Sequence, residues 1–140
     1  MKAYEHKVQY YETDKMKFTH HSNYIRFMEE ARIAYLDHIG WGYDKLEKEG
    51  ILSPVVSVTC DYKKSTSFPD TIAIVIRVLE LSAVRLKLGY TMTVSDKVVC
   101  TASSTHCFLN QSGRPISIKK QYPELYSLLE SMKAEDERDA

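Results

Sequence analysis

Cysteine, proline and glycine are all scarce in this chain of 140 residues. Its three cysteines, Cys60, Cys100 and Cys107, lack the paired spacing of a metal or redox motif, and so sparse and odd a number does not make a disulfide framework. We expect them to be small core residues in a reducing compartment, and hence a cytoplasmic protein. With four prolines, five glycines and 11% aromatic residues, the composition is also unlike that of a disordered chain.

An excess of charge of one sign and long apolar runs are missing as well. The 19 basic side chains equal the 19 acidic ones, which removes the electrostatic basis for a dedicated nucleic-acid binder. No segment approaches the roughly 20 apolar residues of a membrane span, and residues 1–12 alternate in polarity, unlike a signal peptide. The length suits one domain over residues 1–140, with an acidic end at 134–140 that we expect to fray.

One long amphipathic helix is predicted over residues 22–39. Its apolar residues follow i, i+3, i+4 and i+7 spacing, a polar residue stands at its start, and Gly40 follows its end. A short helical piece is expected at 43–49 and a closing helix at 123–133. Alternating polar and apolar residues predict strands, and these segments are 3–12, 52–62, 71–78, 84–94 and 98–110.

This order of a strand, a long helix and four further strands limits the architecture. Long strands joined by short turns pair antiparallel, and one face of the predicted sheet is strongly apolar. The 22–39 helix is the one predicted element long enough to cover that face. We therefore expect an α+β fold in which a curved antiparallel sheet of about five strands wraps around one long central helix.

A candidate site lies in residues 10–24, which join the first strand to the predicted helix. Asp14 stands in this loop seven residues before His21, near the unpaired N–H groups of a helix start. Ester-type hydrolysis uses such a pair, because the backbone donors stabilise an oxyanion and the carboxylate attacks the carbonyl or activates water. The alternative is that Asp14 is an ordinary turn or capping residue.

The same segment resembles a known family. Asp14, residues 20–24 (HHSNY) and residues 26–32 (RFMEEAR) are similar to the signature of hot-dog-fold acyl-CoA thioesterases, and more narrowly of their 4-hydroxybenzoyl-CoA thioesterase-like branch. The resemblance covers most of the chain, since the order of the elements also matches. One departure is Lys17, which stands where the family commonly has a glycine that permits positive φ.

The resemblance implies a role for each residue of the segment. Asp14 would be the catalytic carboxylate, as nucleophile or general base, and the backbone N–H of His21 would polarise the thioester carbonyl. The His21 imidazole would orient water or substrate, while Asn23 and Tyr24 would shape the loop and the substrate site. No metal or redox cofactor is implied, because coenzyme A is part of the substrate.

Two further expectations concern the surface. Long edge strands favour association, and the resemblance implies a homodimer or homotetramer whose pocket is completed by a second chain, with the 55–62 strand as a candidate interface. A basic edge is a candidate binding site for the phosphates of coenzyme A, the alternative being a solvated strand face. It consists of Lys63, Lys64, Arg77, Arg85 and Lys87.

Other titratable residues have plainer interpretations. His20 and His21 are a poor metal pair, because adjacent side chains diverge and no second cluster has ligand spacing, so we predict no metal site. His106 is expected to be a hydrogen-bonded core or interface residue. Glu29 and Glu30 lie on the long helix, where a glutamate is usually solvated, with a site carboxylate as the alternative.

These features together predict a hydrolase that cleaves an acyl-CoA thioester into a free acid and coenzyme A. One alternative is an enoyl-thioester hydratase or dehydratase on the same architecture, although such an enzyme usually carries its Asp and His on the helix. The other is a binding module that holds acyl thioesters without turning them over. The acyl group itself is not readable from the sequence.

Overall fold

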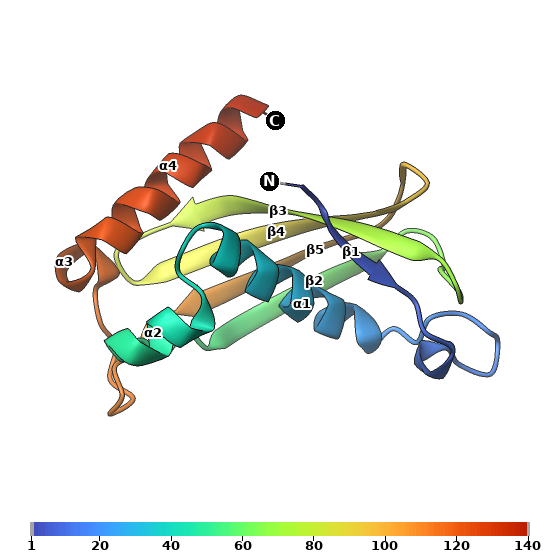
Figure 1. The fold of residues 1–140 in the computed structure, drawn as a ribbon, viewed down its shortest axis with the longest axis horizontal. Coiled ribbons are helices and arrows are strands. Elements are labelled where there is room, and N and C mark those ends of the chain that lie inside the picture. The colour runs from blue at the N-terminus through green and yellow to red at the C-terminus, as the bar shows by residue number, and fades with distance from the viewer. Residues whose placement is uncertain (1, 140) are drawn as a thin grey trace.

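A five-stranded antiparallel sheet forms the body of the protein in the computed structural model, which describes residues 2–139 (Figure 1). Its order is β1-β3-β4-β5-β2, so β1 and β2 are the edges. The strands are β1 (Tyr4–Lys7), β2 (Val55–Tyr62), β3 (Thr71–Leu81), β4 (Arg85–Val94) and β5 (Lys97–Cys107). The predicted antiparallel sheet is therefore confirmed, although β1 is short and gives way to the 3-10 helix η1 (Tyr10–Glu12).

Helix α1 (Asn23–His38) begins and ends within one residue of its predicted bounds. Its apolar stripe is buried, and Phe27, Met28 and Ala31 are each 1% exposed or less. The helix packs against β1 and β3, where Ile72 and Ile74 are equally buried. Each fully buried side chain of the size of Phe or Met contributes about 1.5–3 kcal/mol, so this contact holds the helix against the sheet.

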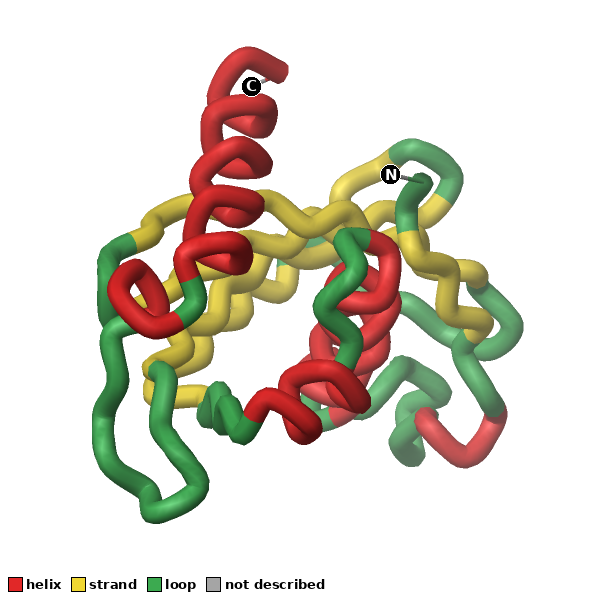
Figure 2. The backbone as a smooth tube through the Cα atoms, turned by 60° about the vertical axis from the view of Figure 1, so that its left-hand side comes forward, coloured by secondary structure: helices red, strands yellow, loops and turns green. Residues whose placement is uncertain are grey.

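Helix α4 (Pro123–Asp139) extends past the predicted end at Lys133 and is slightly longer than α1. Leu125 and Leu129 are buried in the core, and the helix lies over β3, on the face that α1 also covers (Figure 2). Asp136 accepts a hydrogen bond from the backbone N–H of Val78 at 2.8 Å, which ties the acidic segment to the sheet. α1 is therefore not the only long helix on this face. Of the segment expected to fray, residue 140 lies outside the described residues.

Two short helices complete the chain, α2 (Tyr43–Glu49) as predicted and α3 (Ile118–Gln121) just before α4. The predicted alternation holds in β3 and β4, where Ile72, Ile74, Leu88 and Met92 are buried. Edge strand β2 differs, because valines on both of its faces are more than a third exposed. Its valines are therefore only partly covered by this chain.

Candidate active site

The loop between η1 and α1 closes on itself and presents Asp14. Thr13 and Thr19 form a β-bridge, the N–H of Asp14 donates to the carbonyl of Phe18 at 2.7 Å, and that of Lys17 donates to the carbonyl of Asp14 at 2.9 Å. Lys17 adopts a φ of +68°, the left-handed conformation that glycine takes most readily. The lysine therefore makes the same kind of turn that a glycine would allow, at a cost in backbone strain.

The Asp14 carboxylate is fixed by this turn. Its Oδ1 accepts hydrogen bonds from the backbone N–H groups of Met16 at 2.8 Å and Phe18 at 3.2 Å. The side chain is partly buried, and within residues 2–139 Oδ2 has no donor. Asp14 is thus a turn residue, and one of its oxygens stays available for chemistry.

The start of α1 supplies a backbone donor at His21. The N–H of His20 donates to the carbonyl of Glu12 at 2.8 Å, and that of Asn23 donates to the carbonyl of His20 at 3.0 Å. The N–H of Ser22 donates to the His20 ring, whereas that of His21 has no acceptor among residues 2–139. The His21 carbonyl is held by the hydroxyl of Tyr62, which donates to it at 3.2 Å. One N–H of the turn is therefore left for a ligand, next to a helix N-terminus.

A pocket of about 340 Å³ connects these two features. It is open to solvent and brings together five of the residues predicted from the sequence, namely Asp14, His21, Tyr24, Lys63 and Lys64. Thr19, Tyr62 and Ser65 complete the lining. Asp14 and His21 therefore line the same cavity, which is the first condition for the two to act on one substrate.

Asn23 and Tyr24 support the pocket from below. The Asn23 side chain is buried and its Nδ2 donates to the carbonyl of Glu12 at 2.9 Å, so it shapes the loop and does not line the cavity. The Tyr24 hydroxyl meets Thr66 Oγ1 at 2.9 Å, and Thr66 in turn meets Thr19 Oγ1 at 2.6 Å. Burial, chiefly, raises the pKa of Tyr24, so its phenol remains neutral.

The predicted basic edge divides into separate groups. Lys63 and Lys64 follow β2 and lie exposed at the rim of the pocket. Tyr62, which lines the pocket, lies opposite Cys100 of β5, and Cys100 lies opposite Met92 of β4, so Met92 marks the pocket end of β4. Arg85 lies at the other end of β4, opposite Cys107. Arg85 is seven residues from Met92 along β4, about 23 Å, and Lys87 lies near the same far end. Within one chain neither can contribute to this pocket.

The remaining titratable residues fall outside the pocket. Glu29 is exposed, and Glu30 accepts a hydrogen bond from the Tyr4 hydroxyl at 2.7 Å. His106 is a buried core residue hydrogen bonded to Ser104 at 2.8 Å, as predicted, and burial followed by the positive charge of Arg32 lowers its pKa to about 4. In residues 2–139 no cluster of three or more His, Cys, Asp or Glu side chains could hold a metal ion.

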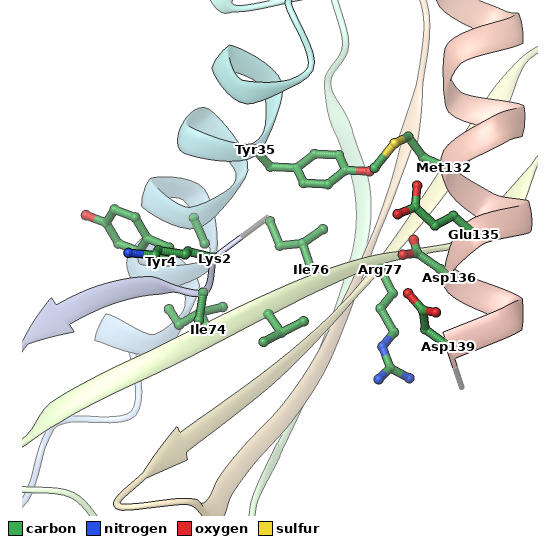
Figure 3. A pocket seen from close by; sticks show the side chains of 13 residues that line it. Lys2, Tyr4, Tyr35, Ile74, Ile76, Arg77, Met132, Glu135, Asp136 and Asp139 are labelled. Carbon is green, nitrogen blue, oxygen red and sulfur yellow. The ribbon is translucent and has the colours of Figure 1, made fainter.

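A second cavity, of about 170 Å³, lies over β3 between the N-terminal strand, α1 and α4 (Figure 3). Tyr35 of α1 points toward Met132, and Asp136 and Asp139 line the α4 side. The Tyr35 hydroxyl is buried and has no hydrogen-bond partner in the described part of the chain, and burial raises its pKa. Arg77 of the predicted basic edge lines this cavity, but Asp14 and His21 do not, so the Asp14–His21 pocket is the stronger candidate.

Sequence reasoning missed Tyr62 and Ser65, which line the pocket, and Thr66, which bonds to Tyr24. Tyr62 and Thr66 lie about 40 positions from the residues they contact, and the pairing of β2 with β5 positions Tyr62. Tyr62 had an alternating position in its strand but no other signal.

None of the helices described in residues 2–139 is both long and apolar enough to span a membrane.

Comparison with known proteins adds an independent observation. Residues 8–134 match the family model of the Thioesterase-like superfamily. The chain is 34% identical over 122 residues to a protein of Aquifex aeolicus provisionally described as an esterase, covering 87% of this chain and 94% of that one. It is 31% identical over 131 residues to YneP of Bacillus subtilis, provisionally described as an acyl-CoA thioesterase, covering 92% and 95%. The crystal structure of a DHNA-CoA thioesterase from Staphylococcus aureus superposes with a TM-score of 0.91 at 27% identity, over 99% of this chain and 95% of that one.

Proposed function

Since the chain belongs to the Thioesterase-like superfamily, we propose that it hydrolyses an acyl-CoA thioester to a free carboxylic acid and coenzyme A. The observation that carries the proposal is the shared pocket of the Asp14 carboxylate and the His21 backbone N–H, which has no acceptor among residues 2–139. The description of YneP as an acyl-CoA thioesterase and the activity named for the Staphylococcus aureus structure support the same substrate class.

The proposed reaction uses the two sides of the pocket. The thioester carbonyl oxygen accepts a hydrogen bond from the His21 N–H, which stabilises the negative charge that develops on it. Asp14 Oδ2 either attacks the carbonyl carbon or removes a proton from the attacking water. The C–S bond breaks, water supplies the hydroxyl of the acid, and the thiolate of coenzyme A takes the remaining proton. The exposed His21 imidazole is placed to orient that water.

The remainder of coenzyme A has a candidate contact at the rim. Lys63 and Lys64 are exposed there, and their backbone N–H groups both donate to the carbonyl of Val99, which fixes the chain from which the amines extend. Ammonium groups at the mouth of a pocket attract phosphates and position them by charge. We assign these two lysines to the phosphates of coenzyme A.

We also propose that the working enzyme is an oligomer of at least two chains joined along β2. This strand is an edge, and Val55, Val56 and Val58 are exposed on it. Antiparallel pairing of two β2 strands about a twofold axis would cover these side chains and place the Val55 end of one chain beside the Tyr62 end of the other. Since Arg85 lies toward the Val55 end of its own sheet, the arrangement directs the partner's Arg85 toward the pocket.

A panel of thioesters tests the proposal. Purified protein is mixed with aromatic, short-chain and medium-chain acyl-CoA substrates, and thiol release is followed against a blank that accounts for the protein's own three cysteines. We expect release above background with at least one member. Hydration of an enoyl-CoA without thiol release would indicate a hydratase instead, and binding of every thioester without turnover would indicate a binding module.

A further inference from the structure

A histidine that the proposed chemistry does not use lies between two carboxylates at the base of the loop. The Nε2 of His6 is 2.8 Å from Glu12 Oε1, and its Nδ1 is 3.0 Å from Glu30 Oε1. The ring rests on Phe27 with the centroids 4.1 Å apart, so it cannot turn freely. The side chains of His6 and Glu12 are 13% and 12% exposed.

Both ring nitrogens of His6 lie within hydrogen-bonding distance of a carboxylate oxygen. A carboxylate only accepts hydrogen bonds, so each contact is made when the ring nitrogen concerned carries a hydrogen. Tyr4 joins the cluster through its hydroxyl, which donates to Glu30; burial and that carboxylate raise the pKa of Tyr4 to about 12. On the sheet, the residue opposite His6 is the apolar Ile72. The His6 ring is therefore held in place between Glu12 and Glu30.

Glu12 connects this cluster to the pocket. Its carboxylate also accepts from the backbone N–H of Gln9 at 2.7 Å, which fixes the side chain against the end of β1. Its carbonyl accepts two further hydrogen bonds, from the N–H of His20 at 2.8 Å and from Nδ2 of Asn23 at 2.9 Å. Glu12 thus holds the turn that carries His21, and Asp14 follows it by two residues.

We infer that His6 is a positioning residue which, through Glu12, sets the spacing between the Asp14 carboxylate and the His21 backbone donor. The effect of His6 on catalysis rests on the proposed function, whereas its effect on the position of the turn does not. Without the His6 ring, the Glu12 carboxylate loses one of its contacts. Glu12 and the turn bound to its carbonyl are then less tightly held.

NMR spectroscopy tests the structural part without reference to activity. In His6→Gln we expect the backbone amide resonances of His20 and His21 to move from their wild-type positions, because the turn is bound to the Glu12 carbonyl. In His38→Gln, a change at the other end of α1, the same resonances should stay in place. A His21 amide that does not respond to His6→Gln overturns the inference whether or not the protein cleaves thioesters.

Kinetics test the catalytic part. For His6→Gln, whose one amide nitrogen cannot occupy the positions of both Nδ1 and Nε2, we expect kcat to fall by about tenfold to a hundredfold, since small displacements of reacting groups cost this much. KM should stay within about twofold. The matched control is His38→Gln, because His38 is exposed in the last turn of α1, and it should behave as the wild type.

Glu30→Gln provides the variant least disturbing to the fold. Its amide oxygen can still accept from Tyr4 and His6, so the ring should stay in place and kcat should fall less than in His6→Gln. An unchanged kcat in His6→Gln, with Asp14→Asn inactive, would refute the positioning role and leave the proposed function intact. Wild-type protein inactive on every thioester would refute the function, and the NMR result would then decide the positioning role alone.

Discussion

Replacing Asp14 by asparagine separates the two roles of this residue. Oδ1 accepts from two backbone N–H groups, and an asparagine oxygen in the same place can accept both of them. The loss is the difference between a charged and a neutral acceptor, about 1 kcal/mol in the free energy of unfolding. For a chain of this length that corresponds to a Tm lower by about 3 °C. The loop should therefore keep its shape.

Activity should respond far more strongly than stability. A positioned general base contributes about 10²–10⁴-fold to the rate, so kcat of Asp14→Asn should fall by at least about 100-fold. Asp14→Ala also removes the two hydrogen bonds of the turn and should be less stable by a further 1–3 kcal/mol or so, yet no less active than Asp14→Asn. Thiol release gives kcat, and thermal unfolding followed by circular dichroism gives Tm.

Asp70 offers the matched control. Its Oδ2 accepts from the backbone N–H of Ser67 at 2.9 Å, so it too is a partly buried turn aspartate, but it does not line the pocket. Asp70→Asn should lower the Tm by a comparable amount and leave kcat unchanged. The reasoning is refuted if Asp14→Asn turns over at near wild-type rate while Asp14→Ala does not, because Asp14 would then act through the turn alone.

Three further outcomes are expected. Lys17→Gly removes the strain of a left-handed lysine and should raise the free energy of unfolding by about 0.5–1 kcal/mol, seen as a higher Tm with unchanged kcat. The pKa of His106 is about 4 in the fold and about 6.5 in the unfolded chain, so the unfolded chain takes up the proton first as the pH drops. The free energy of unfolding should therefore fall by roughly 3 kcal/mol between these two pH values, and His106→Gln should lessen the fall. Val58→Asp at the β2 edge should yield monomers by light scattering and lower thiol release, while Val98→Asp, also exposed but beside the β4–β5 turn, should keep the wild-type mass.

Local patterns predicted the elements that carry their information in neighbouring residues. α1 was predicted within one residue at each end because its buried stripe repeats with the helical period and Gly40 ends it. The end of α4 was not predicted, because the last turns of this helix are charged and no local pattern distinguishes them from a frayed tail. What keeps them helical is a tertiary contact, the hydrogen bond from Val78 to Asp136, and no periodicity reports such a contact.

The candidate site divides in the same way. Asp14, His21 and Tyr24 were predictable because they lie within one short segment, and Lys63 and Lys64 because a pair of cations stands out in any sequence. The Tyr62 contact depends on the register of β2 against β5, in which a slip of one residue would turn the side chain to the other face. Arg85 shows the opposite limit, since its charge was visible but its distance from the pocket along β4 was not.

The turn that Asp14 forms and the catalytic role proposed for it are compatible in one arrangement. An aspartate on a flexible loop would have to give up side-chain freedom each time it reached the reacting carbonyl. Here the two hydrogen bonds to Oδ1 remove that freedom during folding, and they leave Oδ2 at a fixed place in the pocket. The left-handed Lys17 belongs to the same construction, because it lies between Met16 and Phe18, whose N–H groups both bond to Oδ1.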